Sequence, residues 1–220
     1  MQRYFQRLFW ILALGVITGY AASDMQASDS GKIRYLSQKM ATDYLLLFSR
    51  KQDPLLQERL QQDISALSET LRQLARHATG EEVNNILDYL SYNKDQIKDL
   101  LKEKPSDTSV DTLLDYTQAL SEGAEAIANI SGTHAAPQYE IRYRLYRIAT
   151  LYMITHLGIE KGETKREFTA AVQTFARHAE RIPSLDALWQ RYSPLLKSAP
   201  FIPHLLDLML IDMDHQVNQG

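Results

Sequence analysis

Apolar residues recur at intervals of three and four along most of the chain beyond residue 27. Two successive stretches each place such residues on one helix face: Ile33, Leu36, Met40, Tyr44 and Leu47, then Leu60, Ile64, Leu67, Leu71 and Leu74. The windows 83–101 and 110–127 continue with the same spacing. No window alternates apolar and polar residues over the length of a strand. Because this spacing is the period of an α-helix, the pattern predicts an all-α fold.

Several residues mark where these helices begin and end. Asp53 directly before Pro54 predicts an N-cap followed by a proline at the first helical position. Thr79 with Glu82 predicts a capping box at the start of the third helix. Pro105 and the polar run 106–109 predict a break before a fourth helix, which continues through Val110.

The second half of the chain repeats the first half with an offset of 108 residues. Six of the first 18 positions from Ile33 are identical after this shift, whereas average composition gives about one. The identical pairs are Ile33/Ile141, Arg34/Arg142, Tyr35/Tyr143, Ala41/Ala149, Thr42/Thr150 and Tyr44/Tyr152. Farther along, with a shorter offset, Leu113-Leu114-Asp115 matches Leu205-Leu206-Asp207.

This repetition predicts a tandem duplication of an antiparallel four-helix bundle. We expect one unit over 27–130 and a second over 136–218, separated by the turn-rich segment 129–140. Thr164 and Ser184 mark the starts of the second and third helices of the second unit. The alternative is a coincidence among leucine-rich helices. The polar identities argue against it, because a core pattern alone does not require them.

Residues 1–22 differ from the rest and are typical of a secretory signal peptide. Two arginines without an acid precede an apolar run over 9–22, and Gly19 and Ala21 supply small residues before a cleavage point. The apolar run is shorter than the about 20 residues that a spanning helix needs. We therefore expect export to the periplasm by a cleaved signal peptide, the alternative being an N-terminal anchor in the inner membrane.

The composition of the chain argues against several classes of function. The net charge is −3 and no basic stripe with interleaved aromatics occurs, which argues against a nucleic-acid partner. The chain has no cysteine, which excludes disulfides, thiolate metal sites and cysteine catalysis. The histidines form no metal-binding spacing, and no catalytic motif appears. We expect a protein that is not an enzyme and that uses neither a cofactor nor a metal.

The segment GKIRYLSQKMA at 31–41 resembles the opening helix of the PilJ-type domain, the N-terminal helical module of type IV pilus chemotaxis transducers. The match is carried by Gly31, Arg34, Leu36, Ser37, Gln38, Lys39, Met40 and Ala41. The segment is also similar to the sensing helix of nitrate/nitrite sensor kinases, in which an arginine binds the anion at a dimer interface. Such proteins usually continue into a membrane helix and signalling modules. None follows here before Gly220, so we expect signalling through a membrane-bound or envelope protein partner.

The resemblance places Arg34 on the anion-binding arginine and makes Arg142 its counterpart in the second unit. It also implies that Ser37, Gln38 and Lys39 belong to the ligand-binding segment. If the two units pack about a pseudo-twofold axis, the two guanidinium groups face each other and offer planar forks to nitrate or nitrite. The alternative is that each arginine pairs with a nearby acid such as Asp29 or Glu140, or is solvated.

Two functions follow as expectations. The first is an exported helical sensor or ligand-binding protein. The second is a structural or adaptor protein of a bacterial envelope or type IV pilus system without a small ligand. The apolar run 205–213 exceeds what one helix face needs, so it is either buried between the units or forms a homodimer or partner surface.

Overall fold

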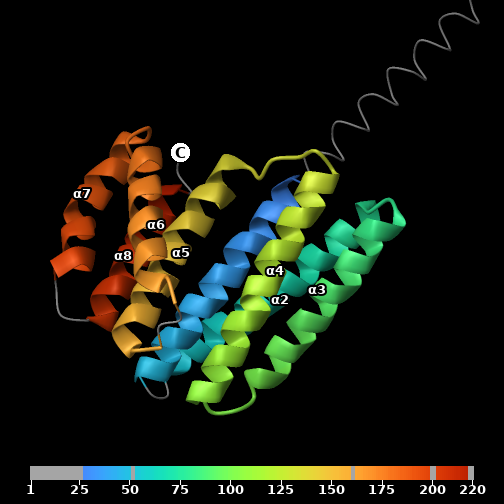
Figure 1. Ribbon diagram of the computed structural model, residues 1–220, viewed down its shortest axis with the longest axis horizontal. Helices are drawn as coiled ribbons and strands as arrows, with labels where there is room; N and C mark the ends of the chain where they lie inside the picture. The colour runs from blue at the N-terminus through green and yellow to red at the C-terminus, as the bar shows by residue number, and fades with distance from the viewer. Residues whose placement is uncertain (1–26, 51–52, 160–161, 199–201, 218–220) are drawn as a thin grey trace, which may run out of the picture.

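The computed structural model describes residues 27–50, 53–159, 162–198 and 202–217 (Figure 1). These residues form eight helices and no strand, which confirms the all-α prediction. The first is the opening helix over 27–50. The others are α2 (Pro54–His77), α3 (Glu81–Leu100), α4 (Asp107–Ile130), α5 (Pro137–Leu157), α6 (Thr164–Ala179), α7 (Pro183–Ser198) and α8 (Pro203–Val217). The predicted signal peptide lies outside the described residues.

The observed first residues of the helices can be compared with the starts that the sequence predicts. Asp53 is the N-cap of α2, and its carboxylate accepts a hydrogen bond from the Leu55 amide at 3.0 Å, as predicted. The predicted capping box at Thr79 is wrong, because Gly80 is the N-cap of α3 and makes no side-chain cap bond. The capping box lies instead at α4, where Ser106 and Ser109 exchange side-chain and backbone hydrogen bonds.

The helices form two groups that share one core. The first group consists of the opening helix, α2, α3 and α4, and within it α3 packs on α2 and α4. The second group consists of α5 to α8. Within it, α5 and α7 each pack on both α6 and α8. Figure 1 shows the second group beside the first, with the opening helix and α5 adjacent. One continuous cluster of buried apolar side chains extends from the opening helix to α8. The two groups are therefore joined by a hydrophobic core rather than by a linker alone.

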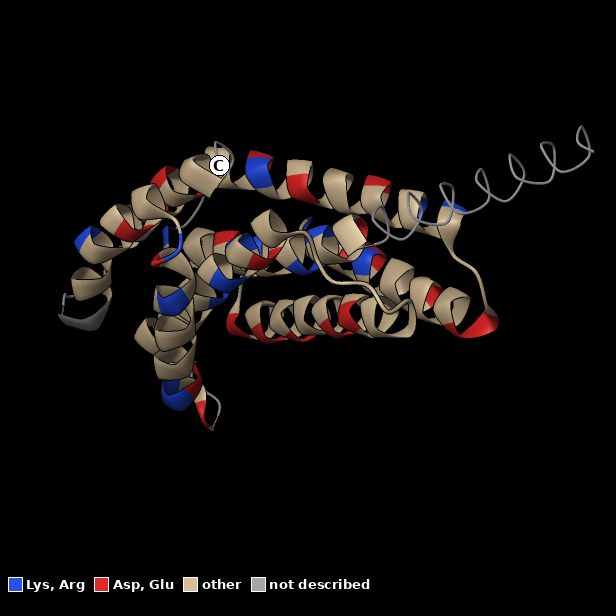
Figure 2. Ribbon diagram, turned by 90° about the horizontal axis from the view of Figure 1, so that it is seen from above, with Lys and Arg blue, Asp and Glu red and all other residues tan. Residues whose placement is uncertain are grey.

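Charged side chains are distributed over the helices of both groups (Figure 2). The exceptions are α4 and α8, which carry acidic residues but no lysine or arginine. Over the described residues, no helix combines the length and the apolar character that crossing a membrane requires. The apolar run on α8 is split: Leu206, Met209, Leu210 and Met213 are buried, whereas Leu208 and Ile211 are 56% and 52% exposed.

Candidate functional site

The opening helix and α5 meet along a seam in which residues 108 positions apart face each other. The hydroxyls of Thr42 and Thr150 lie 3.0 Å apart in the buried centre of this seam. The Thr42 hydroxyl also lies 3.2 Å from the Tyr146 carbonyl, and the Thr150 hydroxyl lies 3.4 Å from the Gln38 carbonyl, so each hydroxyl shares its one proton among several acceptors. Since Tyr146 is offset from Gln38 by the same 108 residues, the two contacts are reciprocal.

The arginines that the sequence singled out lie near the start of the same seam. The Arg34 guanidinium lies over the Tyr143 ring, 4.1 Å from its centroid, and Arg142 lies over the Tyr35 ring at 5.3 Å. Both distances suit cation–π attraction. Residues in contact across the seam differ in number by close to 108 at every point. The two helices therefore run parallel, because in an antiparallel pair the residue number would fall on one helix as it rises on the other.

Gly31 permits the helices and the preceding loop to approach closely at this end. A Cβ atom on Gly31 would lie 2.8 Å from the Ala135 Cβ and 3.1 Å from the Tyr139 Cβ. The first distance is shorter than packed side chains allow, so a larger residue here requires a shift. The glycine that carries part of the family resemblance therefore has a steric role in the seam.

Each arginine also pairs with carboxylates. Arg34 contacts Glu140 of α5 at 3.2 Å and Glu125 of α4 at 3.7 Å. Arg142 contacts Asp214 of α8 at 2.8 Å. The arginine side chains are only 17% and 11% exposed, so these pairs are partly shielded from water. The two arginines thus lie side by side near the starts of the opening helix and α5. The positive charge of each is paired with carboxylates from neighbouring helices.

A pocket of about 280 Å³ opens beside Arg34. Besides Arg34 it is lined by Ser30, Gly31, Glu125, Ala128, Asn129, Thr133, His134, Ala135 and Glu140. It holds one guanidinium and two carboxylates, so an anion that binds the Arg34 NH1 and NH2 groups competes with Glu140 and Glu125 for them. Glu140 is suited to this exchange, because its other oxygen contacts Arg144 at 2.6 Å and would keep that partner.

The remaining residues of the predicted ligand segment point in different directions. The Ser37 hydroxyl donates to the Arg34 carbonyl of its own helix at 2.7 Å. Gln38 is buried and lines a different cavity, while Lys39 contacts Asp63 of α2. Ser37 and Gln38 follow Arg34 by three and four residues and share its helix face, whereas Lys39 lies about 140° away around the axis. Their role in ligand binding stays a prediction.

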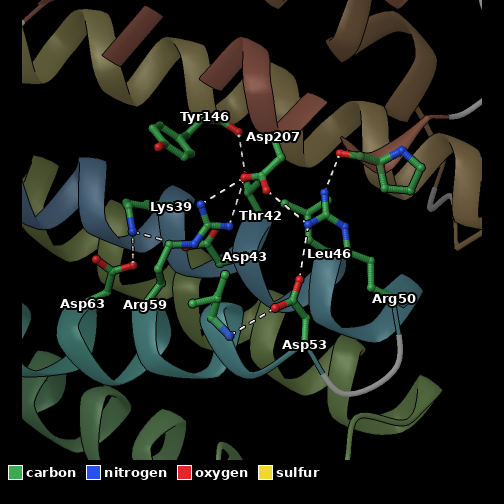
Figure 3. A network of polar contacts seen from close by, with 12 residues as sticks. Lys39, Thr42, Asp43, Leu46, Arg50, Asp53, Arg59, Asp63, Tyr146 and Asp207 are labelled. Carbon is green, nitrogen blue, oxygen red and sulfur yellow. Dashed lines mark hydrogen bonds and ion pairs between the residues drawn. The ribbon is translucent and has the colours of Figure 1, made fainter. Parts of the chain in front are cut away.

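Lys39 belongs to a chain of alternating charges between the opening helix, α2 and α8 (Figure 3). Its ammonium group contacts Asp43 at 3.2 Å and Asp63 at 2.5 Å. Arg59 of α2 then bridges Asp43 at 3.3 Å and Asp207 of α8 at 3.0 Å. This part of the network connects the second helix group to the first through charged hydrogen bonds.

The same chain continues to the end of the opening helix. Arg50 contacts Asp207 at 3.1 Å and Asp53 at 3.4 Å, and it donates to the Pro203 carbonyl at 2.8 Å. Asp53 in turn caps α2. One carboxylate of α8, Asp207, is therefore held by two arginines from the first group, which fixes α8 against both the opening helix and α2.

Sequence reasoning missed this network, although a signal was present. Asp43 and Asp63 lie on the apolar faces of their helices, next to Tyr44 and Ile64. A carboxylate at such a position requires a buried partner. Burial raises the pKa of Asp63 to about 6, with Asp43 adding to the rise and Lys39 opposing it. One ammonium group is shared by two carboxylates here, so Lys39 does not fully compensate either of them.

Comparisons of the chain with known proteins do not identify a family. No family model matches the chain, and no curated protein or solved structure matches it. Within the described part of the chain, no group of three or more metal-ligating side chains is placed to hold a metal ion.

Proposed function

We propose that this protein is an exported, non-enzymatic helical sensor of PilJ type that binds a small anion such as nitrate or nitrite and signals through an envelope partner. In this proposal its two tandem four-helix units are the internal counterpart of the two subunits that form the site in the sensors that the sequence resembles. The observation that carries the proposal is the reciprocal packing of Arg34 on Tyr143 and Arg142 on Tyr35.

The pocket at Arg34 is where the anion would bind. A planar oxyanion would take the place of the Glu140 oxygen that lies 3.2 Å from Arg34 and would use the same guanidinium fork. Glu140 would remain paired with Arg144. Because Glu140 lies in the first turn of α5, releasing it from Arg34 changes a contact between α5 and the opening helix. That change is the event that a partner would read.

Isothermal titration with sodium nitrate and sodium nitrite, at ionic strength matched with sodium chloride, tests the proposal. We expect wild type to bind, Arg34→Ala to lose binding, and Glu140→Gln to bind more tightly because the competing carboxylate is gone. Arg166→Ala is the matched control, since Arg166 is exposed and pairs with the nearby Glu163 on the surface. If neither wild type nor Glu140→Gln binds either anion, the anion-sensor proposal is wrong.

The adaptor function is a second candidate because of the exposed apolar residues on α8. Leu208 and Ile211 lie one turn apart and form an apolar strip on its outer face. A photo-crosslinker at position 208 should then capture one discrete envelope protein, and a crosslinker at position 166 should not. The same captured protein at both positions would argue against a specific surface on α8.

A further inference from the structure

The outward face of α8 carries four exposed side chains in a single line. They are His204, Leu208, Ile211 and His215, at successive intervals of four, three and four residues. Because an α-helix turns by about 100° per residue, all four lie within about 60° of its circumference. Leu208 and Ile211 form an apolar centre, 56% and 52% exposed, with one histidine on either side. We refer to these four residues as the α8 stripe.

The α8 stripe contains no lysine, arginine or carboxylate. Each carboxylate of α8 is engaged with another part of the chain: Asp207 with Arg50 and Arg59 (Figure 3), Asp212 with the Tyr192 hydroxyl, and Asp214 with Arg142. The net charge of the chain is −3, so two copies repel each other on average. The α8 stripe offers an approach in which no unpaired carboxylate of α8 faces another.

The spacing of the α8 stripe is the same when it is read from either end. Intervals of four, three and four are those of the inward-facing a and d positions of a coiled coil. If two copies of α8 pair in antiparallel orientation about a twofold axis, Leu208 of each copy faces Ile211 of the other. His204 of each copy then faces His215 of the other. A twofold dimer requires a surface that is complementary to itself in this way, so the pattern fits a second copy of the same chain.

The exposed tyrosines of α3 do not form a surface of this kind. Tyr89 and Tyr92 are 53% and 57% exposed and lie one turn apart. The exposed Glu82 lies on the same helix face, and a shallow pocket beside Tyr89 is lined by both Glu81 and Glu82. Pairing this face with a second copy would oppose like charges. Of these two exposed pairs, the one on α8 is therefore suited to self-association.

We propose that two copies of this protein associate through the α8 stripe, with the two α8 helices antiparallel about a twofold axis. The inner side of α8 is already buried in the core, so association does not have to order the helix. The contact from residue 204 to residue 215 is about 16 Å long, which is at the small end of specific interfaces. We therefore expect a weak dimer with a dissociation constant of about 10–100 µM. The dimer does not depend on anion binding, and it occupies the surface that the adaptor function assigns to an envelope protein.

Sedimentation equilibrium of the purified protein, up to about 0.5 mM, tests for the dimer. Leu208→Glu should raise the dissociation constant at least about tenfold, because it places a carboxylate against Ile211 of the other copy. Leu55→Glu is the matched control, since Leu55 is 71% exposed on α2, and it should leave the dimer unchanged. Arg34→Ala should dimerise like wild type, which separates this proposal from the anion site. A wild-type protein that stays monomeric at the highest concentration, or a dimer that Leu208→Glu does not weaken, would overturn the proposal.

Disulfide crosslinking tests the antiparallel orientation, because the chain has no cysteine of its own. A mixture of His204→Cys protein and His215→Cys protein should form a disulfide between the two variants. Each variant alone should crosslink poorly, because the same residue of the two copies is then about 16 Å apart along the pair. Crosslinking of each variant with itself but not in the mixture would indicate a parallel pair and contradict the proposal. A photo-crosslinker at position 208 that captures an envelope protein and no second copy would also contradict it, and would assign the stripe to the adaptor function.

Discussion

The hydroxyls of Thr42 and Thr150 are in hydrogen-bonding contact at 3.0 Å, although the two residues are 108 positions apart in the chain. The same offset that relates the two halves of the sequence therefore relates two side chains at the centre of the structure. Both hydroxyls are buried, and each also reaches a carbonyl of the facing helix. This contact joins the opening helix to α5 at a polar point within an apolar seam.

A double-mutant cycle measures that contact. Thr42→Val and Thr150→Val each remove a hydroxyl at nearly constant shape, and each should lower the free energy of unfolding by about 1–2 kcal/mol, because the partner groups stay buried. The double variant should lose at least about 0.5 kcal/mol less than the sum, since the residues share one hydrogen bond. Urea denaturation gives these values. Thr169→Val on the exposed side of α6 is the control and should change little. Strict additivity would mean that the two hydroxyls do not interact.

The second prediction concerns the stability that Lys39 contributes, because its ammonium group is shared by two buried carboxylates. Lys39→Met keeps most of the aliphatic volume but leaves Asp43 and Asp63 without this ammonium group. The expected loss of unfolding free energy at neutral pH is about 3–5 kcal/mol, the usual cost of an uncompensated buried charge. Lys102→Met, whose partner Asp99 is equally exposed, should cost less than about 1 kcal/mol. Similar losses for the two variants would show that the Lys39 contacts are solvated.

The raised pKa of Asp63 gives a pH dependence with a definite sign. Burial raises this pKa to about 6, so the folded protein binds the proton more tightly than the unfolded chain does. The stabilisation from this proton is fully present below about pH 4 and is lost as pH rises through about 6. Asp63→Asn imitates the protonated form at every pH. The unfolding free energy of wild type minus that of Asp63→Asn should therefore fall by roughly 2 kcal/mol between pH 4 and pH 7.

Denaturation curves for both proteins across this range provide the difference, in which the contributions of other titrating groups largely cancel. Asp43, Lys39 and Arg59 face Asp63 and remain in both proteins. A difference that rises with pH would mean that Lys39 lowers the pKa of Asp63 more than burial raises it.

The sequence pattern predicted helices well because each helix buries one face. Spacings of three and four located the buried stripe of α2, and the chemistry of a proline at the first helical position located its start. The start of α3 was misplaced because Thr79 with Glu82 has the right spacing for a capping box, whereas Gly80, with a positive φ of 100°, is the actual N-cap. Local spacing alone does not distinguish these two solutions.

The candidate site was predictable only in part. The offset of 108 residues identifies Arg34 and Arg142 from the sequence alone, because arginine stands at both matching positions. Their carboxylate partners Glu125 and Asp214 come from α4 and α8, and no local pattern connects those helices to the arginines. In the chain of charges, the spacing of Lys39 and Asp43 on one helix allows their pairing, whereas the contacts of Lys39 with Asp63 and of Arg59 with Asp207 form only when the helices pack.

Gly31 provides the last prediction, because the close approach that it permits has an identified neighbour. Gly31→Ala places a methyl group 2.8 Å from the Ala135 Cβ and should lower the free energy of unfolding by about 1–3 kcal/mol, as overpacking usually does. Adding Ala135→Gly removes that neighbouring methyl group and should recover part of the loss. The recovery stays partial because the Tyr139 Cβ, at 3.1 Å, remains. Thermal and urea denaturation of the two single variants and the double variant measure both effects. If Gly31→Ala instead stabilises the protein, as an alanine does in an unobstructed helix, then the loop before α5 yields at no cost and the approach at Gly31 does not constrain the seam.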